Sequence, residues 1–95
     1  MSKQQYRSEM GMISDILQTT MEHGTQGTII SSIARISNLS HYTAVEKCQK
    51  LVGFGLMESR KYKRGQIFAI TEKGIEFFKE LQRFEEYLQA LKIRI

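Results

Sequence analysis

A short basic run lies between two strand-like segments in the second half of the chain. Residues 56–60 and 66–70 each have the length and apolar content of a β-strand. The run Arg60-Lys61-Tyr62-Lys63-Arg64 joins them, and Gly65 follows it at once and supplies a turn. The pattern predicts one β-hairpin of the longer-loop kind. Because most other segments have helical periodicity, the chain must fold as a mostly helical protein with a small sheet.

The first segment is expected to form one helix. Ser8 is a suitable N-cap, and the helix should run from Ser8 to about His23, with Gly24 as the left-handed residue after it. Residues 25–27 then make a short connection or a minimal strand. The core-facing stripe of this helix consists of Met12, Ile13, Ile16, Leu17, Thr20 and Met21.

Two further helices are expected before the hairpin. Thr28 should cap the first, which ends at Ser37-Asn38, because asparagine tolerates the left-handed conformation. Ser40 should cap the second, from about His41 to Val52, and Gly53 should stop it. A turn of about three or four residues between two helices is typical of a helix-turn-helix unit. The first of these helices carries Ile29, Ile30, Ile33, Ala34 and Ile36. The inward stripe of the second consists of Ala44, Val45, Cys48, Leu51 and Val52.

The last segment is expected to be one helix that Thr71 caps and that runs to the end of the chain. Its apolar residues repeat at intervals of four and three, the heptad spacing of a coiled coil. These residues are Phe77, Leu81, Phe84, Leu88, Leu91 and Ile95. Packing of this seam on its own domain is the alternative, with Ile75 and Phe78 anchoring the helix start. A seam of roughly 27 Å would use much of the apolar surface of so small a domain, so a homodimer is favoured.

The charges beside this seam favour one orientation of the pair. Glu80 and Glu85 flank its start, whereas Lys92 and Arg94 flank its end. A parallel pair would bring Glu80 close to the partner's Glu85, and an antiparallel pair would bring acidic and basic halves together. We therefore expect an antiparallel homodimer.

The order of elements defines the fold class. Three helices, a hairpin and a fourth helix make an α+β, mostly α, winged helix-turn-helix, with the basic run as the wing. Residues 1–7 are expected to be a flexible N-terminal segment. Residues 8–74 form the winged-helix domain, and residues 75–95 form a C-terminal coiled-coil dimerisation helix.

The charge of the chain is concentrated in the wing. The chain has 14 Lys and Arg against 10 Asp and Glu, and a net charge of +4. The basic run supplies four positive charges and no negative charge, so the other positions balance. A basic finger of this kind is typical of contact with a polyanion, and the expected partner is double-stranded DNA.

The third helix of a winged helix usually enters the major groove, so its outward face is the candidate for base recognition. That face holds His41, Tyr42, Thr43, Glu46, Lys47, Gln49 and Lys50. Gln49 can pair with adenine, and Glu46 can accept a hydrogen bond from a cytosine amino group. The alternative for each residue is a solvated helix face.

Backbone contacts are expected mainly from the wing. Arg60, Lys61, Lys63 and Arg64 should contact phosphates or the minor groove, and Tyr62 should pack on sugar or on its own strand. Alternation along the hairpin predicts Lys61 and Lys63 on one side and Arg60, Tyr62 and Arg64 on the other. Arg35, Ser37, Asn38 and Ser40 are further phosphate candidates, although capping explains the polar residues of the turn. Lys3 and Arg7 are weaker candidates.

Other classes of function find no support in the residues. Cys48 is the only cysteine and lies on an apolar helix face, where core packing explains it better than redox chemistry. His23 and His41 have no companion ligands, so no metal is expected. No catalytic constellation can be assembled, so we expect no enzyme activity and no cofactor. No apolar run approaches the roughly 20 residues of a membrane span. We expect a cytoplasmic, nucleoid-associated protein without a small-molecule ligand.

The chain resembles a known family in three places. These are Ile36-Ser37-Asn38-Leu39-Ser40, Gly55-Leu56-Met57, and Phe68-Ala69-Ile70-Thr71-Glu72-Lys73-Gly74. The resemblance is to archaeal winged-helix DNA-binding proteins over roughly residues 8 to 90. More closely, the chain is similar to the small archaeal nucleoid-associated winged-helix proteins with an antiparallel C-terminal coiled coil. This resemblance implies a homodimer that binds double-stranded DNA.

Three functions remain open at this point. A dimeric transcriptional regulator is favoured, because the positive charge is confined to the wing rather than spread over the surface. The alternatives are an architectural nucleoid protein and a winged-helix module that binds other proteins.

Overall fold

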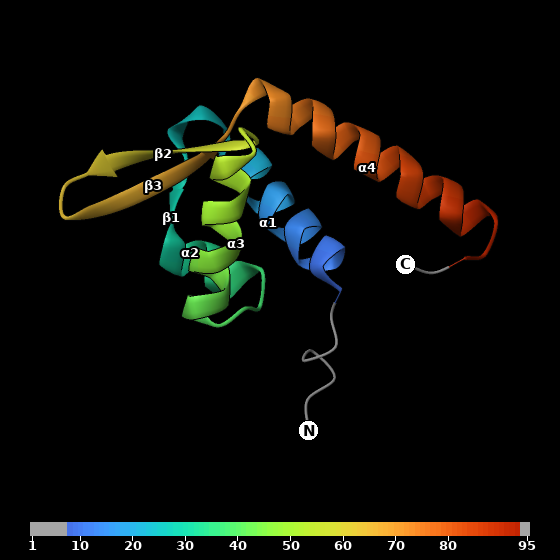
Figure 1. Cartoon of the computed structure of the whole chain (residues 1–95), viewed down its shortest axis with the longest axis horizontal. Helices are drawn as coiled ribbons and strands as arrows, with labels where there is room; N and C mark the ends of the chain where they lie inside the picture. The colour runs from blue at the N-terminus through green and yellow to red at the C-terminus, as the bar shows by residue number, and fades with distance from the viewer. Residues whose placement is uncertain (1–7, 94–95) are drawn as a thin grey trace.

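A computed structural model describes residues 8–93 of the chain. Three helices form the body, a hairpin projects from one side of it, and a long helix leaves on the other side (Figure 1). The three strands form one antiparallel sheet in the order β1-β3-β2. The elements are α1 (Glu9–His23), the 3₁₀ turn η2 (Gly24–Gln26), β1 (Thr28–Ile29), α2 (Ile30–Ile36), α3 (His41–Gly53), β2 (Met57–Tyr62), β3 (Gly65–Ile70) and α4 (Glu72–Ala90).

The expected winged helix-turn-helix architecture is therefore confirmed. Its core gathers one face of each helix against the inner face of the sheet. The buried cluster consists of Ile13, Ile16, Leu17, Ile33, Cys48, Leu51, Leu56, Met57, Phe68, Ile70 and Phe78. Burial raises the pKa of the Cys48 thiol to about 12, so this cysteine is a packed, protonated core residue.

Three N-caps expected from the sequence are confirmed. The side chains of Ser8, Ser40 and Thr71 accept hydrogen bonds from backbone N–H groups in the first turns of α1, α3 and α4. Each hydroxyl satisfies a donor that the helix itself leaves unpaired. These caps depend on local sequence alone, which is why the starts of α1, α3 and α4 could be predicted.

The start of α2 differs from the expectation. Thr28 does not cap a helix, because Thr28 and Ile29 form β1 and pair with Phe68 and Ile67 of β3. The helix begins at Ile30, and Ile29 precedes it without a side-chain cap. A third strand therefore widens the hairpin into a sheet and joins it to the helix-turn-helix.

The end of α3 also differs. Gly53 does not stop the helix but is its last residue, and Gly55 takes the left-handed conformation with φ 77°. The Leu56 N–H then donates to the Leu51 carbonyl at 3.0 Å, which closes a Schellman-type turn. The apolar Leu56 is buried directly after that turn, so its packing in the core determines where helix α3 ends.

The last helix ends before the chain does. Lys92 is left-handed with φ 60°, and the Ile93 N–H donates to the Leu88 carbonyl at 2.8 Å. This is the same turn as after α3, so Leu91 is the C-cap and the expected continuation to the chain end is wrong within the described residues. Ile95 and Arg94 lie outside those residues.

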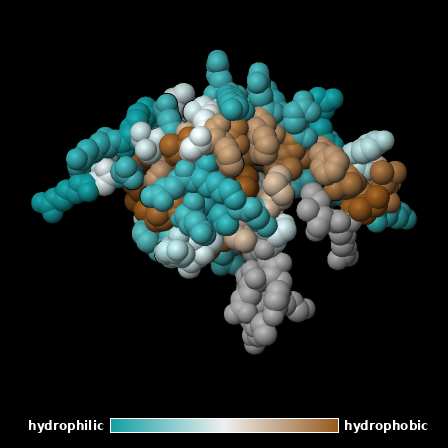
Figure 2. Space-filling view, in the orientation of Figure 1, coloured by the Kyte–Doolittle hydropathy of each residue, from teal (hydrophilic) through white to brown (hydrophobic). Residues whose placement is uncertain are grey.

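Much of the apolar face of α4 is not covered by the chain itself. Ile75 and Phe78 pack at its start as expected, and Leu81 is also covered, at 7% exposed. Leu81, which was expected in the dimer seam, is therefore a core residue of its own chain. Phe84 and Leu91, further along the same seam, are each 54% exposed. In Figure 2 hydrophobic residues continue along α4 to its far end. None of the described helices is long and apolar enough to cross a membrane.

Candidate nucleic-acid interface

The wing is a tighter hairpin than the sequence predicted. Strand β2 continues through Arg60 and Lys61 to Tyr62, which pairs with Gly65. Only Lys63 and Arg64 remain in the turn, and Lys63 takes the left-handed conformation with φ 52°. The long loop is therefore a correction, and Gly65 is a strand residue. Three of the five residues of the basic run lie on strand β2, which fixes the direction of their side chains.

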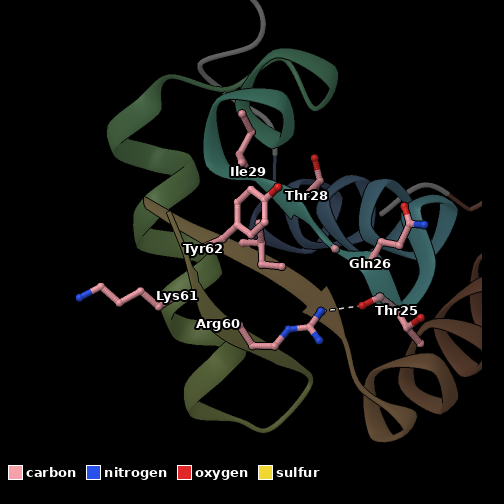
Figure 3. A pocket seen from close by; sticks show the side chains of 9 residues that line it. Thr25, Gln26, Thr28, Ile29, Arg60, Lys61 and Tyr62 are labelled. Carbon is pink, nitrogen blue, oxygen red and sulfur yellow. Dashed lines mark hydrogen bonds between the residues drawn. The ribbon is translucent and has the colours of Figure 1, made fainter. Parts of the chain in front are cut away.

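The two sides of the wing are chemically different. Arg60 and Tyr62 lie on the side of β1, whereas Lys61 points away from them (Figure 3). This alternation was expected, but it stops at Tyr62. The Lys63 ammonium lies 5.3 Å from the centre of the Tyr62 ring, because the turn brings it back over its neighbour.

Arg60 is held by the protein. Its guanidinium donates to the Thr25 carbonyl at 2.5 Å (Figure 3). The guanidinium also lies 3.8 Å from the carboxylate of Glu58. The bond to Thr25 joins the wing to the η2 turn beside a hollow of about 570 Å³, which Ile29 and Ile67 also line. Arg60 therefore supports the wing. Lys61 and Arg64 form no ion pair with any residue that the structure describes, so with Lys63 they are the available cations.

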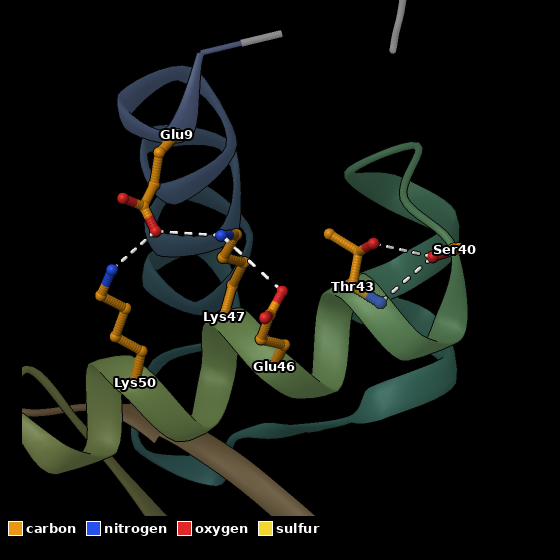
Figure 4. Close-up of polar contacts among 6 residues, drawn as sticks. All are labelled: Glu9, Ser40, Thr43, Glu46, Lys47 and Lys50. Carbon is orange, nitrogen blue, oxygen red and sulfur yellow. Dashed lines mark hydrogen bonds and ion pairs between the residues drawn. The ribbon is translucent and has the colours of Figure 1, made fainter. Parts of the chain in front are cut away.

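The outward face of α3 is open to solvent at five of the seven expected positions. His41, Tyr42, Glu46, Gln49 and Lys50 are exposed, and Tyr42 is 76% exposed. Thr43 is half-buried, and its hydroxyl accepts a hydrogen bond from Ser40 at 2.9 Å (Figure 4). The exposed set mixes donors and acceptors, as base-edge recognition requires.

Lys47 and Lys50 are both paired with a residue of α1, although 44% of the Lys50 side chain remains exposed. Both side chains turn toward α1, where their ammonium groups donate to the same oxygen, Oε2 of Glu9, at 2.9 and 2.8 Å (Figure 4). The Lys47 side chain is only 15% exposed. Hydrogen bonds from Lys50 and Lys47 lower the pKa of the Glu9 carboxyl to about 2. The hydrogen bond to Glu9 in turn raises the pKa of Lys47.

The contribution of Glu9 was not foreseen from the sequence. As an acidic residue in a first helical turn, Glu9 has an ordinary explanation in the helix dipole. Its two partners are 38 and 41 positions away, so no local pattern connects them.

The turn between α2 and α3 is only partly available to a ligand. Ser37 is buried at 3% exposed, with its hydroxyl 3.4 Å from that of Thr19, so its expected phosphate contact is wrong. Ser40 is engaged as the N-cap of α3. Arg35 and Asn38 are exposed, and Asn38 has φ 58°, as expected for the residue that ends α2. Lys3 and Arg7 lie outside the described residues.

The residues described contain no group of three or more His, Cys, Asp or Glu side chains that could hold a metal ion. His23 has a structural contact, since its Nδ1 lies 2.8 Å from the Thr19 carbonyl. His41 is exposed at the start of α3.

The chain belongs to the winged helix-turn-helix family, whose model matches residues 6–89. No curated protein matches the sequence. Among solved structures, Sso10a-2, a DNA-binding protein from Sulfolobus solfataricus, is 22% identical, with 90% of each chain covered and a TM-score of 0.69. AF1382 from Archaeoglobus fulgidus is 16% identical over 92% of this chain and 97% of its own, with a TM-score of 0.71.

BpsR of Bordetella bronchiseptica, whose DNA binding is regulated by 6-hydroxynicotinic acid, has a TM-score of 0.74 at 14% identity. The match covers 83% of this chain and 57% of BpsR, so the chain spans little more than half of that protein. At these identities the structural likenesses establish the fold.

Proposed function

We propose that this protein is a dimeric double-stranded-DNA-binding protein that acts as a transcriptional regulator. The observation that carries the proposal is the pairing of two surfaces within one winged helix. Lys61, Lys63 and Arg64 are available at the end of the wing, and α3 has an exposed face of mixed donors and acceptors. Membership of the winged helix-turn-helix family supports it.

In the proposed complex the wing lies along the DNA backbone. Its three cations bind phosphate or enter the minor groove, and each phosphate contact releases counterions, so affinity depends on salt. Tyr62 and Arg60 hold the wing in position. Helix α3 enters the major groove, where Gln49 and Glu46 face adenine and cytosine edges and His41 and Tyr42 lie near the helix start.

We propose that two copies associate through α4 in an antiparallel coiled coil. The exposed Phe84, Leu91 and half-buried Leu88 support this arrangement, because these apolar side chains lie beyond the buried core cluster of the body. Phe77 is 36% exposed and extends the surface toward the body. There it lines an apolar pocket of about 470 Å³ with Met10, Ile13 and Phe54. An antiparallel pair centred on Phe84 would bring the partner's last turn close to this pocket, because Phe77 and Leu91 are each seven residues from Phe84.

An architectural role on the nucleoid is the second candidate. Sso10a-2, described as a DNA-binding protein, and AF1382 are both archaeal, and the similarity to them over nearly the whole of both chains supports an archaeal DNA-binding protein. In either role the protein works on the nucleoid, in the cytoplasm, and we propose that it needs no small-molecule ligand.

The deciding experiment is selection of bound fragments from a random duplex library by the purified protein without added ligand. A regulator should enrich a motif with two half-sites at a fixed spacing, which also reports the dimer. An architectural protein should bind duplex DNA without enrichment. Binding to duplex DNA no tighter than to heparin would contradict both roles and favour a protein-binding module.

A further inference from the structure

Glu9, Lys47 and Lys50 form a compact charged cluster at the flank of α3. A single carboxylate oxygen accepts from two ammonium groups at 2.9 and 2.8 Å (Figure 4). The two lysines lie one helical turn apart on α3, and the Glu46 carboxylate lies 3.8 Å from Lys47. The cluster thus joins the first turn of α1 to the middle of α3.

Lys47 and Lys50 have the geometry of an anion-binding site, and the anion that occupies it is the Glu9 carboxylate of the same chain. Two ammonium groups that converge on one oxygen make the charge-assisted contacts that lysines also make with a phosphate oxygen. The cluster borders the exposed face of α3, since the exposed Glu46 lies 3.8 Å from Lys47 and Lys50 is itself exposed one turn after Glu46. Glu9 itself is partly exposed, with 42% of its side chain accessible, so the cluster is reachable from solvent.

We infer that Glu9 is a specificity-determining residue, which occupies the phosphate site of α3 and so removes two lysines from sequence-independent DNA binding. The inference rests on the proposed function, and it adds a residue of α1 that no DNA-contact pattern includes. A phosphate must displace the carboxylate to reach Lys47 and Lys50, and it meets repulsion from Glu9 as it approaches. Non-specific affinity then rests on the wing, while α3 contributes mainly through base edges.

The test compares Glu9→Gln with Glu22→Gln. Glu22 lies on the same helix, its carboxylate is bonded to Gln18 at 3.5 Å, and its replacement changes the net charge equally. Affinity is measured by fluorescence anisotropy for a random-sequence duplex and for the duplex enriched by selection, over a range of salt concentrations.

Glu9→Gln should tighten binding to the random duplex about tenfold at low salt and steepen the slope of log affinity against log salt by roughly one to two units. The ratio of specific to non-specific affinity should fall. Glu22→Gln should leave the slope unchanged. Equal behaviour of the two variants, with wild-type binding intact, would overturn the inference and leave the proposed function standing.

A second variant decides the matter if Glu9→Gln does not fold. Replacing both Lys47 and Lys50 by glutamine in the otherwise wild-type chain should leave the slope of log affinity against log salt for the random duplex nearly unchanged, because neither lysine neutralises a phosphate in the wild type, even though the freed Glu9 carboxylate lowers the affinity. A slope flattened by roughly two units would show that both lysines bind DNA phosphate in the wild type, against the inference. If no variant and no wild-type protein binds duplex DNA, the proposed function and this inference both fall.

Discussion

Individual side chains of this protein are used in ways that their identity does not reveal. Arg60 and Lys61 are adjacent cations on β2, yet Arg60 bonds the Thr25 carbonyl while Lys61 points into solvent. Glu9 similarly combines with Lys47 and Lys50 rather than remaining a solvated helix-start residue. At this scale, function depends on which charges are already paired.

The titration of Glu9 is the direct test of its pairing. Its pKa is lowered to about 2, so the stabilising contact is fully present above the ordinary glutamate value and is lost as pH falls through about 2. Carbon NMR of the Glu9 carboxyl should therefore give a midpoint well below 4. With Lys47 and Lys50 both changed to alanine, the midpoint should return to roughly 4.3. The same Glu9 midpoint in the wild type and in the double variant would refute the contact.

Gly74 is a residue at which any side chain is expected to fail. A Cβ there would lie 2.0 Å from the Leu56 carbonyl oxygen and 2.7 Å from Ile70, because the first turn of α4 packs directly on the strand entry. We expect Gly74→Ala to destabilise the fold by about 3 kcal/mol. Denaturant unfolding measures the change.

Gly53→Ala is the matched control for that substitution. Gly53 is helical and has nothing within 4 Å of the added Cβ. Alanine should leave stability unchanged or raise it by about 0.5 kcal/mol, since it is the better helix former. Equal losses at both positions would contradict the close approach at Gly74.

At the scale of elements, the wing is a rigid two-stranded hairpin with its free cations at one end. Its strands pair over six residue pairs from Met57 and Ile70 to Tyr62 and Gly65, and β1 supports β3 from the other edge. The position of the cations is therefore set by the sheet rather than by a loop. A binding element of this kind loses little conformational freedom when it contacts DNA.

Removing two wing cations should lower DNA affinity for all sequences alike. The double variant Lys61→Ala with Arg64→Ala should flatten the slope of log affinity against log salt by roughly two units, one for each lost phosphate contact. Filter binding or anisotropy over a salt series measures it. Lys79→Ala with Arg83→Ala, an equal charge change on exposed positions of α4, should leave the slope nearly unchanged. Equal slopes for the two variants would remove the wing from the interface.

At the scale of the whole molecule, α4 gives the protein an extended shape of 46 × 36 × 20 Å. Its start belongs to the body through Ile75 and Phe78, while Phe84 and Leu91 are exposed further along. A helix that projects an apolar face is stable in water mainly when another surface covers it. This shape fits the proposed dimer, in which a winged-helix body would lie at each end.

Phe84→Glu should dissociate this dimer. A buried aromatic anchor contributes at least about 2 kcal/mol to an interface, so the dimer dissociation constant should rise about thirtyfold or more. Sedimentation equilibrium measures it. Gln89→Glu, with the same added charge on an exposed position of α4, should have little effect. A dimer that survives Phe84→Glu would move the interface elsewhere.

The orientation of the pair has its own test, in a chain with Cys48 changed to alanine and Leu91 to cysteine. In an antiparallel pair centred on Phe84, the two positions lie roughly 20 Å apart along the helices, so no disulfide should form between them. Rapid formation of a 91–91 disulfide would indicate a parallel pair.

The sequence by itself determined the order of elements, the N-caps at Ser8, Ser40 and Thr71, and the concentration of charge in the wing. These features are local, because a cap or an apolar period involves residues within a turn or two of one another. The fold class followed from them, and so did the exposed residues of α3 and the wing as a candidate interface.

Only the tertiary structure decided which of the predicted residues are free to act. It paired β1 with β3, buried Ser37 and Leu81, and joined Arg60 to Thr25 and Lys47 to Glu9. Each of these features depends on how the chain packs. The paired residues are far apart in the sequence, so no local pattern encodes their contact. Seven residues were first assigned to the outward face of α3. In the folded protein the side chains of Thr43, Lys47 and Lys50 already bond other residues of the chain, so fewer than seven are free to contact DNA.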